Sequence, residues 1–455
     1  MKKIAEIFQQ QKIFFNLHKT DNYHFRKRQL IKLKRILRQY ENELLLALNK
    51  DLRKSKIEAF LTEFSLVYTE INYQIRTLKK NMSLKRKRTP IFLFKAKSYV
   101  KNDAYGQVLI VGPFNYPLQL VLMPLIAALA TGNTVIVKPS EQSYYTSTLL
   151  QEMINTNFKS NYLYVTDFNG EKNDLAALLD LSFDFIFFTG SNRIGQIVLE
   201  KAAVNLTPVV LELGGKSPSI VDRDADIKMS AKRIVWGKLL NVGQTCIAPD
   251  YLLVHQAVKE QLVVELIKEI EKQYGTNAFF SPDYGRIINE KALARLIVYL
   301  QENEIIYGGK YDKNDLYFAP TLIEVTDLNS KIMQEEIFGP ILPIITFTNL
   351  DDEIAKLKNK DKPLALYYFG KSINKIIKQT TSGGLVINDT LIHASNKYLP
   401  FGGVGQSGMG YYHGRASFEI FSHQKSIMKR SNIVEFSLRY APFKNKIKLI
   451  SKFFR

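Results

Sequence analysis

The sequence has a single cysteine among 455 residues, at position 246. One thiol excludes an intramolecular disulfide and fits a reducing compartment. Proline is also scarce, with 15 residues, whereas 46% of the residues are hydrophobic, which is typical of globular proteins. The chain begins without the continuous apolar block of a signal peptide, and its most apolar segment, residues 118–131, is too short to cross a bilayer. We therefore expect a cytoplasmic globular protein of about two or three domains.

Charge is the one unusual total. Lys and Arg number 63 against 43 Asp and Glu, a formal net charge of +20 that also occurs in proteins that bind nucleic acids or anionic membranes. The basic residues are spread along the chain, with clusters at residues 85–88 and 444–455, and no zinc-finger or RNA-binding signature accompanies them. We interpret the charge as a solvated surface that attracts acidic ligands such as a dinucleotide, and expect no nucleic acid and no metal. For residues 445–455, contact with a membrane surface is an alternative to a docked or frayed tail.

Hydrophobic periodicity divides the chain into a helical opening and an alternating α/β remainder. Three helices are predicted before residue 80, over residues 4–15, 25–48 and 51–78. The later runs predict strands over residues 104–111, 134–138, 163–168, 183–188, 207–213, 251–255, 341–347 and 364–369, and helices over 118–130, 175–181, 225–240, 259–274 and 290–303, with further helices opening at residues 139–141 and near 192. This alternation predicts parallel sheets with right-handed crossovers.

A strand, a glycine turn and a helix follow one another at residues 185–195. Gly190 and Ser191 follow the strand directly, and the helix is expected to begin at about Asn192. Glycine lets the backbone approach a pyrophosphate, and a helix N-terminus offers free N–H donors. Because the spacing from Gly190 to Gly195 is not the usual one for a dinucleotide turn, a nucleotide site and an ordinary tight turn are both open interpretations.

Two residues are candidates for chemistry. Cys246 lies among Gly, Gln, Thr, Pro and Asp, a composition typical of a turn, where a thiol is accessible as a nucleophile; the alternative is a buried core cysteine. Glu212 lies inside an apolar run, where a carboxylate is costly unless it is paired or protonated. Burial would raise the pKa of Glu212 toward neutrality, as suits a general base, and a salt-bridged structural role is the alternative.

Seven segments, in order along the chain, resemble the NAD(P)-dependent aldehyde dehydrogenases. They are residues 113–117, 138–141, 188–191, 212–216, 243–246, 335–340 and 400–405. The resemblance covers about residues 15–430, and the short N-terminal region with residues 247–251 and 407–414 is similar to the class 3, fatty-aldehyde-type branch. It implies an α/β fold of two Rossmann-like open parallel-sheet domains with a small β oligomerisation flap. The implied division is residues 1–211 for the NAD(P)-binding domain, with 97–104 in the flap, 212–395 for the catalytic domain, and 396–455 for a segment that returns to the core and the flap and ends in a basic tail.

The resemblance also implies roles for the catalytic residues. Cys246 would attack the aldehyde to give a thiohemiacetal, whose oxyanion is held by the Asn115 side-chain amide and the Cys246 backbone N–H. Hydride transfer to the nicotinamide leaves a thioester, and Glu212 activates the water that hydrolyses it. No histidine adjoins Cys246 in sequence, so backbone dipoles and the cationic nicotinamide are expected to activate the thiol.

Cofactor and partners follow from the same resemblance. We expect NAD, with NADP as a second cofactor, a homodimer, and medium- or long-chain aliphatic or aromatic aldehydes as substrates. The implied contacts are the adenosine ribose for Lys138 and Glu141, the pyrophosphate turn for Gly190, Ser191 and Gly195, and the nicotinamide ribose and ring for Glu336 and Phe338.

Three other functions are compatible with parts of the sequence. An acylating enzyme would end the reaction with coenzyme A or phosphate, but such relatives usually lack a base at the position of Glu212. A Cys–His hydrolase could take its base from His393, His413 or His423, but it would leave the nucleotide turn unexplained. A basic nucleic-acid-binding protein on this fold is the non-enzymatic alternative.

Overall fold

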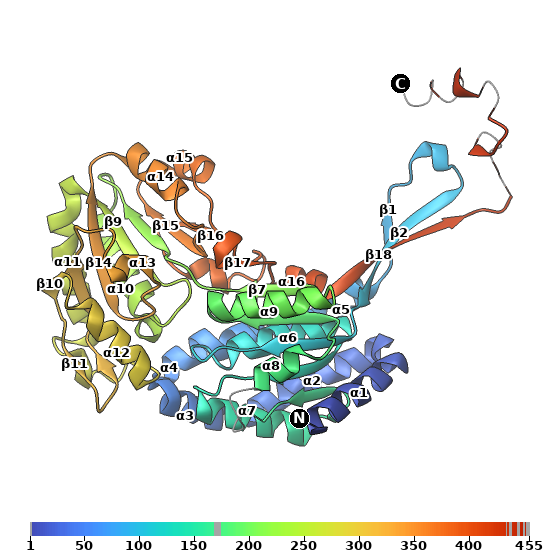
Figure 1. Cartoon of the computed structure of the whole chain (residues 1–455), viewed down its shortest axis with the longest axis horizontal. Coiled ribbons are helices and arrows are strands. Elements are labelled where there is room, and N and C mark those ends of the chain that lie inside the picture. The colour runs from blue at the N-terminus through green and yellow to red at the C-terminus, as the bar shows by residue number, and fades with distance from the viewer. Residues whose placement is uncertain are drawn as a thin grey trace.

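The computed structural model describes residues 2–167, 174–433, 435, 439–443, 446–448 and 451. Two open sheets with helices around them form the body, and a thin three-stranded arm projects from one end (Figure 1). The predicted α/β class with two Rossmann-like sheets is therefore confirmed. Most of the predicted basic tail, and residue 168 of one predicted strand, lie outside the described residues. Among the described residues, no helix combines the length and the apolar character needed to cross a membrane.

The first sheet has the strand order β17-β7-β6-β3-β4-β5. Its strands are β3 Gln107–Val111, β4 Thr134–Lys138, β5 Leu163–Val165, β6 Phe185–Thr189, β7 Val209–Glu212 and the short β17 Gly408–Met409. All neighbours run parallel except β17, which lies antiparallel to β7. Helices α6 Gln119–Thr131, α7 Tyr144–Asn157, α8 Asp174–Leu179 and α9 Asn192–Val204 belong to this half. The apolar strands are buried, as expected for a parallel sheet covered on both faces.

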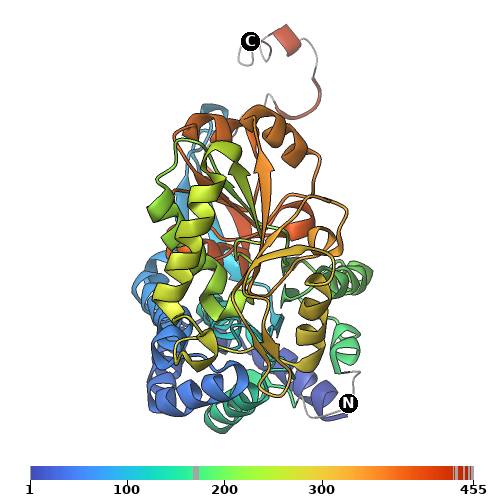
Figure 2. The ribbon, with the colours of Figure 1, turned by 90° about the vertical axis from the view of Figure 1, so that its left-hand side faces the viewer.

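The second sheet has the order β10-β13-β14-β9-β8-β15-β16, and only the edge strand β10 is antiparallel. Figure 2 shows this half end-on, with α11 (yellow-green) and α12 (gold) on opposite sides of its strands. Its strands are β8 Pro218–Val221, β9 Tyr251–His255, β10 Glu304–Tyr307, β13 Thr321–Glu324, β14 Ile341–Phe347, β15 Ala365–Phe369 and β16 Gly384–Ile387, and a separate ribbon pairs β11 Tyr311–Asp312 with β12 Tyr317–Phe318. Its helices are α10 Ile227–Leu239, α11 Lys259–Tyr274, α12 Glu290–Tyr299, α13 Lys331–Gln334, α14 Leu350–Lys358 and α15 Ile373–Gln379.

The N-terminal helices differ from the prediction in two respects. The observed elements are α1 Lys2–Asn16, α2 Tyr23–Gln39, α3 Glu41–Leu52, α4 Lys56–Ala59, a π turn Phe60–Phe64 and α5 Ser65–Met82. The predicted helix over residues 51–78 is interrupted, because α3 ends at Leu52 with Arg53 in a left-handed conformation and the chain becomes helical again only at Lys56.

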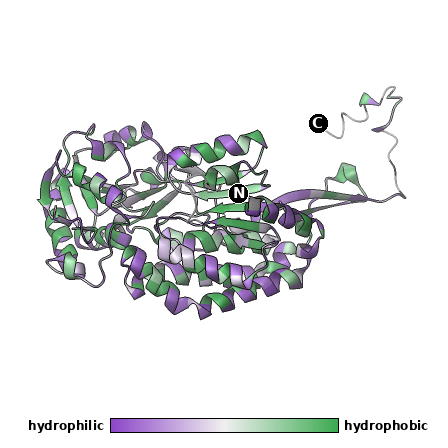
Figure 3. Ribbon diagram, turned by 60° about the horizontal axis from the view of Figure 1, so that its bottom comes forward, coloured by the Kyte–Doolittle hydropathy of each residue, from purple (hydrophilic) through white to green (hydrophobic). Residues whose placement is uncertain are grey.

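The predicted continuous helix over residues 25–48 is wrong, because the chain leaves the helix at Tyr40. Leu37 and Leu44 are buried on either side of this break, so the hydrophobic pattern continues across it. Figure 3 shows the consequence of that pattern, with hydrophobic central strands and alternating hydrophobic and hydrophilic bands on the surrounding helices.

The arm consists of β1 Lys85–Lys87, β2 Ala96–Ala104 and β18 Ser422–Arg430. Strand β18 runs antiparallel to β2 over its whole length, from the pair Ser422–Ala104 to the pair Arg430–Ala96. The chain reaches β18 from α16 Gly414–Ile420, which lies beside α5 and α6 in the body (Figure 1). Residues 97–104, which the resemblance assigned to a flap, therefore pair with a strand from the end of the chain that sequence reasoning did not predict.

Candidate active site

Cys246 follows a strained turn. Asn241, Val242 and Gly243 have φ values of 52°, 56° and 74°, which is unusual for a β-branched residue such as Val242. A Cβ on Gly243 would lie 2.2 Å from the backbone oxygen of Gly339, so no larger residue fits there without a shift. The turn that carries the thiol is thus packed directly against the 336–340 loop.

Hydrogen bonds fix the same turn from both sides. The side chain of Gln244 donates to the backbone oxygen of Arg286 at 2.9 Å, and the hydroxyls of Tyr116 and Thr245 share a hydrogen bond of 2.6 Å. Cys246 itself is partly exposed. The thiol therefore lies on a rigid turn that packs against the hydrophobic core and leaves the residue only partly exposed.

The surroundings of Cys246 disfavour its ionised form in the protein alone. Burial of the thiol raises its pKa, and the nearby carboxyl groups of Glu336 and Glu212 raise it further. Hydrogen bonds from the backbone N–H groups of Cys246 and Ile247 lower it without offsetting the rise. The thiol of Cys246 and the carboxyl groups of Glu336 and Glu212 are therefore close enough to influence one another electrostatically. An added positive charge beside the thiol would favour the thiolate.

Glu212 ends strand β7 and has no partner for its charge. It is 3% exposed, and among the described residues neither carboxyl oxygen accepts or donates a hydrogen bond. Burial raises the pKa of Glu212 well above its usual value. The salt-bridged alternative thus has no counter-ion within the described ranges, and the carboxyl group is left free to exchange a proton with a small molecule.

Asn115 lies in the loop after β3 and is buried. Its side-chain amide donates one N–H to the backbone oxygen of Gln244 at 3.0 Å, two residues before Cys246. A primary amide has two N–H groups, so this bond fixes the plane of the amide and leaves the second donor for another acceptor. The predicted oxyanion donor is thus tied directly to the nucleophile turn.

Glu336 reaches over the glycines that follow β7. A Cβ on Gly214 would lie 1.9 Å from the Glu336 carboxyl, so the carboxyl group occupies the space that a side chain would fill. Burial, with the nearby charge of Asp250, raises the pKa of Glu336 to about 8, although the N–H of Gly215 opposes the rise. The guanidinium of Arg295 donates to the backbone oxygen of Glu336 at 2.8 Å and holds this segment in place.

Phe338 has a left-handed backbone, with φ of 48°. Its ring meets the ring of Phe114 edge-on at 5.8 Å, and Phe114 is the neighbour of Asn115. The loop of residues 336–340 and the loop of residues 112–117 therefore meet beside the thiol turn.

The Gly190–Ser191 turn has the predicted form, and α9 begins at Asn192 as expected. The side chain of Ser191 makes no cap hydrogen bond, so the first N–H groups of α9 have no side-chain acceptor. Gly195 has a different environment. Its N–H bonds within the helix to Ser191, and a Cβ there would lie 2.6 Å from the side chain of Leu213. Gly195 thus allows the helix to approach the sheet closely.

Lys138 and Glu141 form an ion pair of 3.0 Å at the end of β4, with the lysine mostly buried and the carboxylate exposed. The predicted helix opening at residues 139–141 is wrong: α7 begins at Tyr144. The reason is a distant cap, since the carboxylate of Asp51 accepts the N–H groups of Tyr145 and Thr146 at 3.0 and 2.8 Å.

A cleft of about 1280 Å³ lies between the two halves of the molecule. It brings together Ser191 and Glu336 from the predicted site. The other predicted residues do not line it: Cys246, Glu212, Asn115, Lys138, Glu141, Gly190, Gly195 and Phe338. Its cationic lining residues are Arg193, Lys216, Arg295, Lys358, Lys360 and Lys362. Glu336 connects the cleft to Cys246, because it lines the cleft and the charge of its carboxyl group raises the pKa of the Cys246 thiol. The cationic lining suits an elongated anionic ligand.

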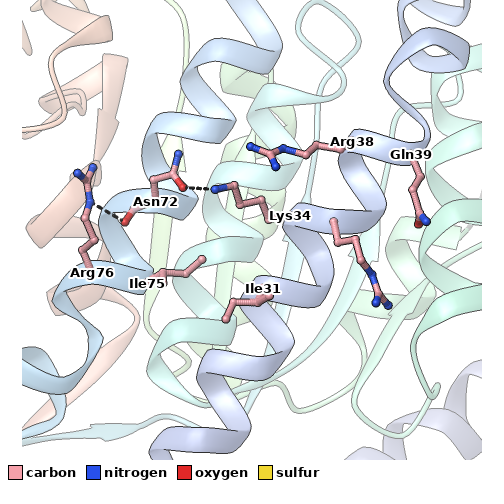
Figure 4. A pocket seen from close by; sticks show the side chains of 8 residues that line it. Ile31, Lys34, Arg38, Gln39, Asn72, Ile75 and Arg76 are labelled. Atoms are coloured by element: carbon pink, nitrogen blue, oxygen red, sulfur yellow. Dashed lines mark hydrogen bonds between the residues drawn. The ribbon is translucent and has the colours of Figure 1, made fainter.

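A second hollow, of about 620 Å³, lies on the outer surface between α2 and α5 (Figure 4). Lys34 donates to the side chain of Asn72 at 2.6 Å, and Arg76 donates to the backbone oxygen of the same residue at 3.1 Å. No predicted site residue lines it. Its basic side chains belong to the solvated surface that the net charge predicts.

The histidines do not supply a base for Cys246. Burial lowers the pKa of His393 to about 4 and that of His413 to about 3, so both imidazoles are weak bases. Among the described residues, neither forms a hydrogen bond with the thiol, and His423 lies on β18 of the arm. The Cys–His hydrolase alternative therefore has no general base in this structure.

Comparison with known proteins places the chain in a class. The model of the "Aldehyde dehydrogenase family" matches residues 4–427, and the chain belongs to this family and is an aldehyde-oxidising enzyme. It is 46% identical, over all of both chains, to the 4,4'-diaponeurosporen-aldehyde dehydrogenase of Staphylococcus aureus. It is 43% identical to aldehyde dehydrogenase family 3 member A2 of Mus musculus, with 92% of this chain and 87% of the relative covered. The predicted class 3 branch is therefore confirmed.

Two further relatives bear on fold and assembly. The dimeric NADP-preferring aldehyde dehydrogenase of Canis lupus familiaris is 40% identical, with 97% of this chain and 98% of the relative covered. The solved structure of Staphylococcus aureus AldH in its substrate-bound state superposes with a TM-score of 0.97 at 46% identity, with 99% of each chain covered. The whole fold, arm included, is thus shared with a solved relative.

Sequence reasoning missed the residues that hold the predicted groups in place. Lys54, Glu63, Asn241 and Arg295 all bond to the loops of the site. Lys54 and Glu63 lie in a segment with helical periodicity, where charged residues usually face solvent. No local signal separates a buried Lys or Glu from an exposed one, so only the folded arrangement reveals them.

Proposed function

We propose that the protein oxidises an apolar aldehyde to its carboxylate, with Cys246 as the nucleophile, Asn115 as an oxyanion donor and Glu212 as the general base. The observation that carries this assignment is the pair formed by a partly exposed cysteine and a buried carboxyl group with no partner of its own. A structural glutamate would not be left unbonded at the end of a buried strand. The acylating alternative has less support, because its chemistry needs no base at this position.

The residues around the cleft fit a nicotinamide dinucleotide. The N-terminus of α9 at Ser191 offers unbonded N–H groups to a pyrophosphate, and Glu336 faces the same cleft at its inner end. Lys138 and Glu141 are assigned to the adenosine ribose, and Phe338 to the nicotinamide ring. When bound, NAD or NADP supplies a hydride acceptor and a positive ring beside the thiol.

The first half of the reaction forms a thioester. The thiol of Cys246 gives its proton to water, its sulfur bonds to the carbonyl carbon of the aldehyde, and the carbonyl electron pair moves to oxygen. The free N–H of the Asn115 amide and the backbone N–H of Cys246 hold this oxyanion. The tetrahedral carbon then loses a hydride, and the carbonyl group re-forms as a thioester.

Glu212 completes the second half. Its carboxylate takes a proton from water while the water oxygen attacks the thioester carbonyl. The carbon–sulfur bond breaks, Cys246 leaves as the thiolate, and the carboxylic acid is released. Since burial raises the pKa of Glu212, the carboxyl group is a better proton acceptor here than a solvent-exposed glutamate would be.

Pre-steady-state formation of reduced cofactor tests the assignment. Cys246→Ala should form none. Glu212→Gln, which keeps the shape of the side chain, should form about one equivalent per site in a burst and then stall, because the thioester accumulates. Normal turnover by Glu212→Gln would remove Glu212 from its role as the deacylating base.

Substrate, assembly and location extend the proposal. Relatives whose names specify a diaponeurosporen-aldehyde support a medium- or long-chain or aromatic aldehyde, and a relative named dimeric supports a homodimer. The arm, with exposed Ile91 and Phe92 near its tip, is the proposed oligomerisation flap. The division into residues 1–211, 212–395 and 396–455 and a cytoplasmic location complete the proposal.

A further inference from the structure

A buried ion pair connects the N-terminal helices to the catalytic loop. Lys54 follows α3 and Glu63 lies in the π turn, and their charged atoms are 2.7 Å apart with both side chains fully buried. Burying two charges is expensive unless further hydrogen bonds satisfy them. The other bonds of the pair therefore indicate what it holds in place.

Lys54 is directed at the loop that carries Asn115. Its ammonium donates to the backbone oxygen of Asn115 at 2.8 Å and lies 4.1 Å above the ring of Tyr116. A cation in this position both fixes a carbonyl group and rests on the adjoining aromatic face. Two successive residues of the catalytic loop are thus held by one side chain.

Glu63 holds the next part of the same loop. Its second carboxyl oxygen accepts the N–H groups of Leu118 and Gln119 at 2.9 and 3.0 Å. These groups open α6, where N–H donors have no acceptor within the helix and a negative charge is favoured. The ion pair therefore spans residues 115–119 from one end to the other.

The same segment also fixes the nucleophile side. The carboxyl group of Glu58 accepts the N–H of Asn241 at 2.9 Å. The side chain of Asn241 in turn donates to the backbone oxygens of Asn115 and Gln244, at 2.9 and 3.1 Å. The oxygen of Asn115 is thus shared between Lys54 and Asn241, and the oxygen of Gln244 between Asn241 and the Asn115 amide.

We propose that Lys54 is a positioning residue for oxyanion stabilisation: it fixes the backbone from which the Asn115 amide projects. The proposal rests on the proposed function, since it assumes that Asn115 is an oxyanion donor. Two donors hold the backbone oxygen of Asn115, and its side-chain amide donates one N–H to Gln244. The second N–H of the amide is therefore restricted to one direction. Without Lys54 only one donor is left on that oxygen, and the loop can shift.

A double-mutant cycle on the full-length enzyme tests the proposal. Lys54→Met removes the charge and keeps a similar length, and it is combined with Asn115→Ala. The readouts are the rate of the reduced-cofactor burst at saturating aldehyde, the apparent KM and the midpoint of thermal unfolding. Lys54→Met should slow the burst by about tenfold to a hundredfold, the loss expected when a catalytic group is displaced by about 1 Å. The apparent KM should change little, because the donor acts in the transition state.

Non-additivity separates positioning from general stability. In the Asn115→Ala background there is no amide to position, so Lys54→Met should slow the burst no further. Its effect on the unfolding midpoint should persist in both backgrounds. If the ion pair were purely structural, Lys54→Met would slow the burst equally in the wild-type and Asn115→Ala backgrounds, or would slow it in neither.

Arg26→Met is the matched control. Arg26 is also a buried cation of the helical layer, and it donates to the backbone oxygens of Thr20 and Ala130, at 2.5 and 3.3 Å. Ala130 lies at the opposite end of α6 from the catalytic loop. Arg26→Met should lower the unfolding midpoint and leave the burst rate unchanged.

Each outcome decides the question. An unchanged burst in Lys54→Met, or an equal slowing with and without Asn115, overturns the positioning role and leaves the proposed function standing. An unchanged burst in Asn115→Ala alone overturns the oxyanion role of Asn115, and the role of Lys54 with it. If Lys54→Met does not fold, Glu63→Gln, which has the same shape, takes its place in the cycle with the same expected non-additivity.

Discussion

The N–H of Gly190 donates to the backbone oxygen of Glu212 at 3.1 Å. Strands β6 and β7 run parallel up to this point, with Thr189 paired with Glu212. The proposed general base and the proposed phosphate turn are therefore at the ends of adjacent strands, where ligands bind in open parallel sheets. A displacement of either group would be transmitted to the other through one backbone hydrogen bond.

The pKa of Glu212 predicts how turnover depends on pH. A base must be ionised, and burial raises the pKa of Glu212 well above its usual value, so deacylation should accelerate as pH rises through the pKa of this group. Steady-state kcat measured from pH 6 to 10, together with the burst rate, checks this. An alkaline rise in kcat that persists in Glu212→Asp and disappears in Glu212→Gln supports the assignment, whereas a flat wild-type profile contradicts it.

The same shift predicts an effect on stability with a definite sign. A carboxyl group whose folded pKa is raised favours folding at low pH, and this contribution is lost as pH rises through the folded pKa. Glu212→Gln removes the titration, so the variant should gain stability relative to the wild type as pH increases. Urea unfolding at pH 5 and pH 9 measures the free energy of unfolding of the variant minus that of the wild type. A difference that fails to become more positive from pH 5 to pH 9 would show that the pKa of Glu212 is not raised in the folded protein.

Glu336 predicts a pH dependence of cofactor binding. Its pKa is raised to about 8, chiefly by burial, so its charge develops between neutral and alkaline pH. An ionised carboxylate attracts the positive nicotinamide ring, and the affinity for the oxidised cofactor should therefore increase through about pH 8. Calorimetric titration with NAD across this range tests it. Glu336→Gln should bind with a pH-independent affinity, and a wild-type enzyme that does the same would disprove the effect.

Gly243 predicts a steric requirement at the nucleophile turn. Gly243→Ala would bring a methyl group within 2.2 Å of the Gly339 oxygen at a φ of +74°, and overpacking of this kind costs about 1–3 kcal/mol beyond the backbone strain. Both the free energy of unfolding and the burst rate should fall. Gly275→Ala is the control, because Gly275 has a φ of +81° with nothing within 4 Å of the added Cβ. It should lose stability by backbone strain alone and keep the burst rate, and equal losses in both variants would refute the steric argument.

The ion pair of Lys138 and Glu141 predicts cofactor preference. The exposed Glu141 carboxylate is paired with the lysine. At the proposed ribose site it would repel an additional phosphate on the ribose. Glu141→Gln should raise kcat/KM for NADP relative to NAD by about twofold to fivefold, the range expected of one exposed charge. The ratio is measured with one aldehyde at two ionic strengths. If the NADP-to-NAD ratio of kcat/KM is unchanged at low salt, the ion pair of Lys138 and Glu141 plays no part in selecting against a 2′-phosphate.

Long apolar runs and turn chemistry predict much of the fold from the sequence. Strands β4 and β9 and helix α11 have the predicted bounds, because each is an uninterrupted pattern between clear turn residues. Strands β8 and β13 were not predicted, since four residues after a proline do not establish a period. The start of α7 depends on a contact with a distant part of the chain, the Asp51 cap, which no local pattern contains.

The candidate site divides in the same way. Residues with unusual local surroundings, the lone Cys246 on a turn and Glu212 in an apolar run, are recognisable in the sequence. The assignment of Gly195 to the pyrophosphate stays a prediction, and the structure adds a packing requirement that the sequence did not reveal, since a side chain there would meet Leu213. The role of Lys54 and Glu63 is visible only in the folded protein, where the N-terminal helices pack against the loop that carries Asn115.

The pairing of β17 with β7 has a consequence for biosynthesis. Gly408 and Met409 cover the outer edge of the strand that ends at Glu212, and they lie far along the chain from it. Until they leave the ribosome, this strand exposes an unpaired backbone edge, which favours association with other chains. A nascent polypeptide therefore presents an open sheet edge beside the proposed general base, and that edge closes only after Gly408 and Met409 have been synthesised.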